Sequence, residues 1–195
     1  MKIQQIAIYT IMKEIQQAGR ILKSIDSNFN NIVESLNNCK GNIITTGVGK
    51  SGIIAKKLTS SLCSIGVSSF FIDPLAGCHG DAGSVKSGDI ILAISNSGNT
   101  KELIEFLTIF DNKIISITEN NESQLYKMSI LSIKTGVQEE AGLLQILPTC
   151  STTCQLILCD AILTCLEHLK QITMDDFIRT HPNGSIPKEY KDANL

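Results

Sequence analysis

The chain carries little charge of either sign and no closely spaced cysteine pair. Charged residues make up 18% of its 195 residues and the net charge is −2, which indicates neither an electrostatic nucleic-acid binder nor a disordered chain. Its seven cysteines form an odd set without a CxxC pair, which disfavours a disulfide framework or a structural zinc site. Most lie in apolar runs, so we interpret them as buried thiols in a reducing compartment: Cys39, Cys63, Cys78, Cys150, Cys154, Cys159 and Cys165.

Long uninterrupted apolar segments are also missing. Gln4 and Gln5, then Lys13 and Glu14, interrupt the N-terminal segment, which leaves no hydrophobic region of a secretory signal. We also find no run of 18 apolar residues that could cross a membrane. We therefore expect a cytoplasmic protein with no membrane partner, and its length suits a single domain over residues 1–195.

Apolar strands alternate with helical patterns along most of the chain. Up to residue 36, apolar residues recur at spacings of three and four, which predicts two helices with a break near Gly19. Five strands are expected at 42–46, 67–72, 89–95, 113–118 and 128–134. Further helices are expected at 51–65, 100–110 and 149–170, with a short helical or irregular piece at 123–126.

These strands are apolar at nearly every residue instead of alternating. Strands of that kind are covered on both faces, as parallel strands in a doubly wound sheet are. The pattern therefore predicts an α/β fold, a three-layer α/β/α sandwich with a five-stranded parallel sheet.

Two glycine-containing turns each follow an apolar strand and precede a helical pattern. They are GVGKSG at 47–52 and SNSGNT at 95–100. A strand that enters a helix through glycines leaves unpaired N–H groups at the positive end of the helix dipole, where an anion binds well. Such turns lie at the carboxyl ends of parallel strands, where ligands bind. The sequence therefore predicts a site for a small phosphorylated ligand, with hydroxyl donors at Ser51, Ser95, Ser97 and Thr100.

Other interpretations of the turns remain open. GVGKSG also matches GxGxxG, and Asp73 follows Gly52 by 21 residues, as a ribose-binding acid would in a dinucleotide site. That alternative leaves the second turn unexplained, so it ranks below the sugar-phosphate interpretation. A P-loop is disfavoured because GxxxxGK[ST] needs glycine where Ile44 stands. SNSGNT alone could be an ordinary helix cap, but the STT cluster at 151–153, which opens a further helix, favours the phosphate site.

Taken in order, several segments resemble the sugar isomerase (SIS) family, and within it the arabinose-5-phosphate isomerases. They are GVGKSG, SSFFIDP, CHGDAG, AISNSGNTKE, EEAG, LPTCSTT and MDDFIRTHPNGS. Departures are Asp73, where histidine is usual, and Asn183, which replaces a glycine. The resemblance is to the isomerase domain, so we expect a short form without the regulatory CBS pair of the family's common long form.

This resemblance implies a flavodoxin-like SIS fold and the reversible conversion of D-ribulose 5-phosphate into D-arabinose 5-phosphate. The reaction passes through a cis-enediolate and feeds the synthesis of Kdo for lipopolysaccharide or capsule. The resemblance also implies a homo-oligomer, with a tetramer favoured over a dimer and sites at subunit interfaces. The helical segment 1–40 would pack on or between subunits.

Individual residues acquire roles from the same resemblance. The catalytic side chains fall on Lys50, Glu102, Glu140 and His181, and the histidine of the HGD segment falls on His79. A zinc ion at His79 would be an inhibitor only, and no cofactor is required. With the turns, the expected substrate-binding set is Gly49, Ser51, His79, Ser95, Asn96, Ser97, Gly98, Thr100, Ser151 and Thr152.

Interconversion of aldose and ketose phosphates needs a base, an acid and stabilisation of charge. Glutamates and a histidine can exchange protons once burial and neighbours bring their pKa values toward neutrality, and a lysine can stabilise an oxyanion or phosphate. We assign the carbon proton to Glu140 and ring opening or oxygen protonation to His181. Glu102 would also fit as a helix-capping residue, and Lys50 as a solvated lysine.

Two other functions stay open. Another SIS isomerase would act on a hexulose 6-phosphate or sedoheptulose 7-phosphate. A non-catalytic sugar-phosphate sensor would use the same fold, which also occurs in transcription regulators. The chain shows no helix-turn-helix module or basic face for nucleic acid, which disfavours the sensor.

Overall fold

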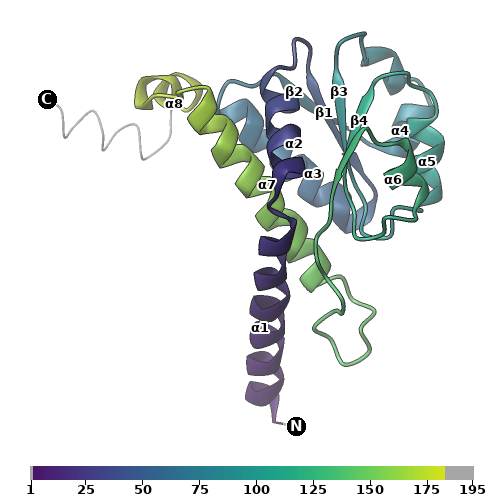
Figure 1. The fold of residues 1–195 in the computed structure, drawn as a ribbon, viewed down its shortest axis with the longest axis vertical. Helices are drawn as coiled ribbons and strands as arrows, with labels where there is room; N and C mark the ends of the chain where they lie inside the picture. Colours follow the sequence, from purple (N-terminus) through teal and green to yellow (C-terminus); the bar gives the residue numbers. More distant parts are fainter. Residues whose placement is uncertain (1, 183–195) are drawn as a thin grey trace, which may run out of the picture.

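The structure is a computed structural model that describes residues 2–182. Its centre is a five-stranded sheet in which all neighbouring strands are parallel, in the order β2-β1-β3-β4-β5 (Figure 1). The chain runs outward from β1 to β2 and then returns to the other side of β1, so strand order reverses between β1 and β3. The strands are β1 (Ile43–Gly47), β2 (Ser69–Ile72), β3 (Ile90–Ile94), β4 (Lys113–Ile117) and β5 (Leu131–Ile133).

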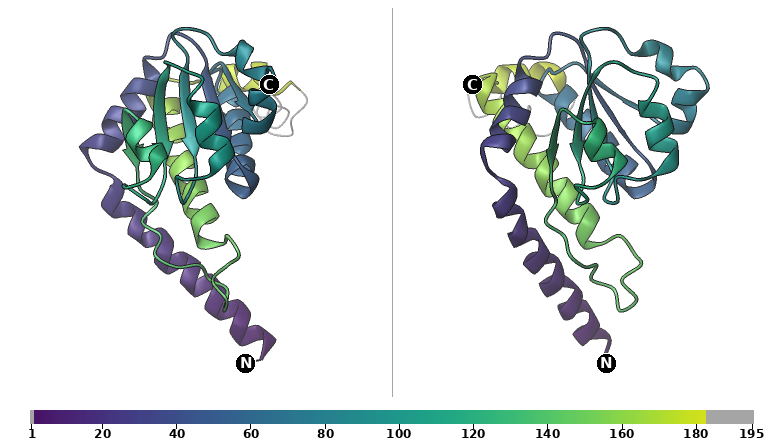
Figure 2. Two further views of the ribbon diagram at one scale, coloured as in Figure 1. Left: turned by 90° about the vertical axis from the view of Figure 1, so that its right-hand side faces the viewer. Right: turned by 45° about the vertical axis from the view of Figure 1, so that its right-hand side comes forward.

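Helices cover both faces of this sheet, because successive strand side chains point to opposite faces and both sets are apolar. Ile90, Leu92 and Ile94 belong to one buried cluster, and Ile91 and Ala93 to the other. The first cluster is completed by α2 (Ser27–Asn37), α3 (Gly49–Ser64) and α7 (Cys150–Leu169). The second is completed by α5 (Lys101–Leu107) and α6 (Gln124–Met128), and α4 (Pro74–Cys78) packs against α5. The predicted three-layer α/β/α architecture is confirmed (Figure 2).

The helices and strands differ from those predicted mainly because the structure contains additional short helices. Helix α1 (Ile3–Gly19) ends at the predicted break and a 3₁₀ turn, η1 (Arg20–Ser24), leads to α2. The sequence reasoning missed α4, the 3₁₀ turn η2 (Asp81–Ser84) and α8 (Met174–Thr180). Asp73 is a helix cap, since its Oδ1 accepts a hydrogen bond from Leu75 N at 3.0 Å, which accounts for this acid without a dinucleotide. Asn183 lies outside the described residues.

Helix α7 supplies much of the core. By length and composition it is the one helix among residues 2–182 that could cross a membrane, with a mean hydropathy of 1.3, yet its apolar residues pack in the first cluster. The cysteines Cys150, Cys154 and Cys159 are fully buried there, as predicted, and burial raises the pKa values of Cys154 and Cys159 to about 12. The same prediction is wrong for Cys63 and Cys78, which are exposed.

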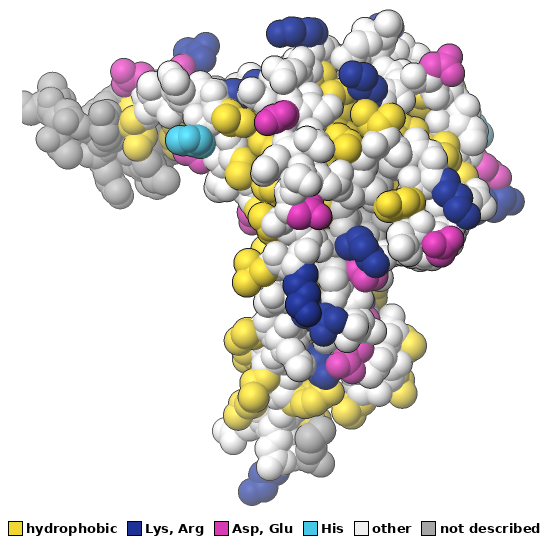
Figure 3. All heavy atoms as spheres, in the orientation of Figure 1, with side chains coloured by type: hydrophobic (Ala, Val, Ile, Leu, Met, Phe, Trp, Pro, Cys, Tyr) yellow, Lys and Arg dark blue, Asp and Glu magenta, His cyan; other side chains and the backbone are white. Residues whose placement is uncertain are grey.

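Helix α1 projects from the body of the molecule, beside the loop that leads from β5 to α7 (Figure 1). Apolar side chains gather on this projection (Figure 3), which we name the apolar arm. Exposed apolar patches of this kind mark interaction surfaces. The arm consists of Ile8, Ile11, Met12 and Ile15 on α1 and Leu143, Leu144, Ile146 and Leu147 on the loop, each more than half exposed.

Candidate functional site

The two glycine turns begin side by side at the point where strand order reverses. Gly47, the last residue of β1, is in register with Ile94, the last residue of β3. The backbone of α3 lies directly against β1 here, since a Cβ on Gly52 would come within 2.6 Å of the Gly47 carbonyl oxygen. No side chain caps the start of α3 or of α5. Their first N–H groups therefore remain open to an anion, as the sequence predicts.

The second turn is held by its own hydroxyl groups. Ser95 Oγ accepts a hydrogen bond from Gly98 N at 3.1 Å and lies 3.2 Å from Thr100 Oγ1. Ser97 Oγ accepts from Asn99 N at 3.3 Å. Within residues 2–182, the buried Oδ1 atom of Asn96 has no hydrogen-bond partner. The turn is thus pre-formed, and the Asn96 amide has unused hydrogen-bonding capacity.

Lys50 and Glu102 lie on the first turns of the helices that leave these two strands. Lys50 is on α3 and Glu102 on α5, which cover opposite faces of the sheet. Both side chains are exposed, and neither makes a side-chain hydrogen bond within the described part of the chain. They therefore flank the carboxyl edge of the sheet from two sides and are free to meet a ligand. Gly49 and Ser51 lie on the same first turn of α3 as Lys50.

Glu140 lies at the N-terminus of α7. Its Oε2 atom accepts hydrogen bonds from Thr149 N at 2.8 Å, Thr149 Oγ1 at 2.9 Å and Ser151 N at 3.2 Å. Partial burial acts to raise the pKa of the Glu140 carboxyl, but the hydrogen bonds from Ser151 and Thr149 outweigh it and hold this pKa below its usual range. The expected shift toward neutrality is therefore wrong in direction. Glu140 is a carboxylate at neutral pH and can accept a proton.

The starts of α7 and α3 lie at the same level. An ion pair joins Lys57 of α3 to Asp160 of α7, and seven residues earlier in each helix stand Lys50 and Thr153. Both helices run in the same direction and rise about 1.5 Å per residue, and packed helix axes lie about 8–10 Å apart. Glu140 is therefore brought beside the first turn of α3, on the side of the sheet that α3 covers.

His181 lies at the other end of the molecule. It follows α8, where Thr180 Oγ1 donates to the carbonyl of Ser64, the last residue of α3, at 3.0 Å. Lys50 stands 14 residues before Ser64, or about 21 Å along the helix at about 1.5 Å per residue. The imidazole stacks on Phe177 with ring centroids 4.0 Å apart. Within one chain, then, His181 is not brought to the other three predicted catalytic residues.

The remaining side chains predicted to bind substrate differ in their exposure and in the hydrogen bonds that they already make. Ser151 is buried at the start of α7, and Thr152 Oγ1 is engaged with the carbonyls of Thr149 and Pro148, at 3.0 and 3.3 Å. His79 is the exposed residue that ends α4. Residues 2–182 contain no group of three or more side chains arranged to ligate a metal. A zinc ion at His79 would therefore find fewer than three protein ligands among residues 2–182.

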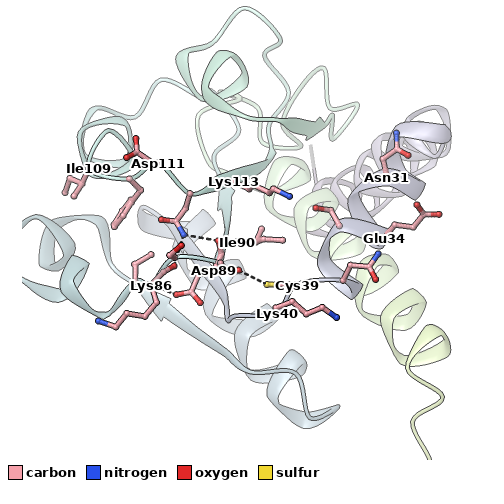
Figure 4. Close-up of a pocket in the computed structure, with 17 residues that line it drawn as sticks. Asn31, Glu34, Cys39, Lys40, Lys86, Asp89, Ile90, Ile109, Asp111 and Lys113 are labelled. Carbon is pink, nitrogen blue, oxygen red and sulfur yellow. Dashed lines mark hydrogen bonds between the residues drawn. The ribbon is translucent and has the colours of Figure 1, made fainter.

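A large cavity lies away from this edge. Its volume is about 870 Å³, and it opens at the amino ends of the strands, next to Lys40, Asp89 and Asn112 (Figure 4). The Asp89 carboxylate is already satisfied, since it accepts hydrogen bonds from Asn42 N and Lys86 N, both at 2.7 Å. Ligands of open parallel sheets bind at the carboxyl ends instead, so the edge of the sheet that carries the two turns remains the candidate site.

Comparison with known proteins agrees with this geometry. The family model described as SIS domain matches residues 35–165, which include both turns, Glu140 and most of α7. The chain belongs to the SIS family. Its predicted flavodoxin-like fold is confirmed by the strand order β2-β1-β3-β4-β5.

Several relatives of this SIS chain share a name. It is 37% identical over 189 residues to the arabinose 5-phosphate isomerase KdsD of Francisella tularensis, with 94% of this chain and 58% of that protein covered. It is 37% identical over 180 residues to KdsD of Pseudomonas aeruginosa, with 91% and 55% covered. The chain thus spans little more than half the length of these relatives. The structure of E. coli CFT073 c3406 in complex with arabinose 5-phosphate is 36% identical, with a TM-score of 0.87 and 91% and 96% of the two chains covered.

Sequence reasoning missed what holds the SIS site together. Thr149, whose N–H and hydroxyl both bind Glu140, was not singled out. A signal for it exists: Pro148 precedes a threonine that opens a long helix, which is typical of an N-cap. The contacts between α1 and the residues before Glu140, described below, leave no comparable signal.

Proposed function

We propose that this chain is an arabinose-5-phosphate isomerase, which interconverts D-ribulose 5-phosphate and D-arabinose 5-phosphate. The observation that carries the proposal is the ionised Glu140 carboxylate on the α3 side of the strand reversal, where the uncapped starts of α3 and α5 follow two neighbouring strands. The helix starts suit a phosphate dianion and the carboxylate suits removal of a carbon-bound proton. The names of the relatives and the arabinose 5-phosphate complex of a similar chain support the same substrate.

Each remaining residue has a part in the proposed reaction. Glu140 removes the proton from one carbon and returns it to the neighbouring carbon, through a cis-enediolate. Lys50 stabilises the phosphate or the developing oxyanion, His181 handles ring opening or oxygen protonation, and Glu102 completes the catalytic set. These transfers need only ionisable side chains, so we propose no cofactor, and we assign zinc at His79 an inhibitory role only. The product would feed the synthesis of Kdo for lipopolysaccharide or capsule, in the cytoplasm.

The test is turnover in heavy water. Purified protein is incubated with D-ribulose 5-phosphate in D₂O, and the products are followed by NMR. We expect arabinose 5-phosphate that carries deuterium at carbon 2, because a carboxylic acid formed on Glu140 exchanges its proton with solvent before returning it. A protein inert with this ketose but active on a hexulose 6-phosphate or sedoheptulose 7-phosphate would contradict the assignment in favour of another SIS isomerase. Tight binding without turnover of any of them would favour a sensor.

The position of His181 supports a homo-oligomer in which one subunit completes the site of another. The distance of about 21 Å along α3 keeps it from Lys50 of its own chain. The apolar arm provides a surface on which a second copy could pack. We favour a tetramer over a dimer, with α1 between subunits.

Shared sites predict complementation. Lys50→Met and His181→Ala proteins should each lose most activity, whereas hybrids formed by mixing unfolded subunits of both and refolding them together should recover a fraction of it. Recovery is expected because some sites in a hybrid combine the intact Lys50 of one chain with the intact His181 of another. Turnover is measured on the separate and the mixed samples. Mixed samples that are no more active than the separate ones would contradict the shared site.

A further inference from the structure

One face of α1 holds the segment that precedes Glu140. Lys13 Nζ lies 2.6 Å from Glu139 Oε1, Gln17 Oε1 accepts a hydrogen bond from Gln138 N at 3.0 Å, and Arg20 Nε donates to the carbonyl of Gly136 at 2.8 Å. Positions spaced by four and three residues share one side of a helix. We name Lys13, Gln17 and Arg20 the α1 clamp.

The clamp is unusual within its own helix. Gln17 is the one buried residue of α1, with 2% exposed, although most of the helix projects into solvent. The Lys13 side chain is 15% exposed, and its bond to Glu139 raises the pKa of Lys13 and lowers that of Glu139. Polar side chains are buried at a cost unless they are hydrogen-bonded. The clamp therefore binds specific groups just before Glu140, namely the backbone of Gly136 and Gln138 and the carboxylate of Glu139.

That segment is a loop that is anchored by individual contacts. No helix or strand is formed between β5 and α7, so the backbone that carries Glu140 is a loop. It is held at its start by Glu119 Oε2, which accepts hydrogen bonds from Gly136 N at 2.6 Å and Thr135 Oγ1 at 3.0 Å. Beyond Gly136, the clamp binds Gln138 N and the Glu139 carboxylate, which also accepts a hydrogen bond from Gln145 Nε2 at 3.4 Å, and Val137 and Ala141 are buried in the first cluster. A general base must be held within about 0.5 Å of its productive position, which a loop does not achieve without such contacts.

We propose that Lys13 and Gln17 are positioning residues that fix the Glu140 carboxylate for proton transfer. The proposal rests on the proposed function of Glu140 and adds α1 to the machinery of that site. Neither residue touches the substrate; they act through Glu139 and Gln138. When the clamp is lost, residues 138 and 139 can drift, and the Glu140 carboxylate leaves the N–H groups of Thr149 and Ser151 for part of the time.

The test uses substitutions that remove each contact but keep side-chain length: Lys13→Met and Gln17→Met. We expect kcat to fall about tenfold to a hundredfold, as a misplacement of about 1 Å can cause, with KM nearly unchanged because the phosphate turns are untouched. The acid limb of the kcat/KM profile should also move to higher pH, because a carboxylate that loses hydrogen bonds to N–H groups has a higher pKa. A purely structural role for α1 would lower the melting temperature without moving this limb.

Matched variants separate these effects. Lys13→Arg, and the charge exchange Lys13→Glu with Glu139→Lys, should restore most of kcat. Lys23→Met is the control, since Lys23 is exposed on η1 and makes no side-chain bond within residues 2–182. A wild-type protein without isomerase activity would contradict the proposed function, and this proposal would fail with it. An active wild type, with a kcat and an acid limb that Lys13→Met and Gln17→Met leave unchanged, would overturn this proposal alone.

Discussion

Replacement of Glu140 by glutamine is expected to reduce kcat by about 10²–10⁴-fold, the usual contribution of a general base. Glutamine has the same shape, and its amide oxygen can still accept the hydrogen bonds that Thr149 N and Ser151 N now donate to Glu140. It cannot accept the carbon-bound proton. The lost charge at the start of α7 should cost only about 0.3–1 kcal/mol of stability. Turnover and thermal unfolding are both measured.

The matched control for this experiment is Glu167→Gln. Glu167 is an exposed glutamate near the other end of α7, and its side chain makes no hydrogen bond within the described part of the chain. It should leave kcat unchanged. Binding of arabinose 5-phosphate to Glu140→Gln, measured by calorimetry, should persist, because the phosphate turns remain. Turnover close to that of the wild type would show that another group takes the proton, and the mechanism proposed for Glu140 would fail.

Replacement of Gly98 by alanine is expected to destabilise the protein by about 2–5 kcal/mol. Gly98 has φ +66°, a conformation that costs a side-chain-bearing residue about 1–2 kcal/mol. Its added Cβ would also stand 2.2 Å from Ser123 Oγ and 2.8 Å from Thr118 Oγ1, both buried. Overpacking of this kind costs about 1–3 kcal/mol. Since whole domains are stable by only about 5–15 kcal/mol, denaturant unfolding should show a large shift of the midpoint.

Gly49→Ala provides the comparison for this loss. Gly49 has φ +59°, nearly the same backbone conformation, but no atom lies within 4 Å of an added Cβ. It should lose only the conformational part, about 1–2 kcal/mol. The difference between the two variants isolates the contact with Ser123 and Thr118. Equal losses would mean that the second turn can shift to make room, and that its shape is less fixed than the contacts of Ser95 suggest.

The sheet and the phosphate turns could be predicted from local patterns. Apolar strands such as Ile90–Ile94 reveal burial on both faces, and glycines at 47, 49 and 98 mark where strands meet helices. Such signals lie within a few residues of one another. For the same reason the position of the two turns at the carboxyl ends of neighbouring strands could be predicted.

Features that depend on distant contacts could not be predicted in this way. The pKa of Glu140 depends on donors that follow a loop, at Thr149 and Ser151, so burial alone suggested the wrong direction. The position of His181 depends on α8 and its bond to Ser64, 116 residues earlier. Lys13 and Glu139 are 126 residues apart, and no periodicity connects them.

The two sides of α1 differ in exposure, and the proposed packing between subunits would give them different partners, which should leave a trace in evolution. On one side, Lys13 and Gln17 form hydrogen bonds with a loop of the same polypeptide. On the other side, Ile8, Ile11 and Ile15 contact nothing within their own fold that would bury them. In an alignment of many relatives, we expect positions 13 and 139 to covary as an intramolecular pair. Positions 8, 11 and 15 should covary instead with residues too remote in the monomer to touch, a signature of quaternary contacts.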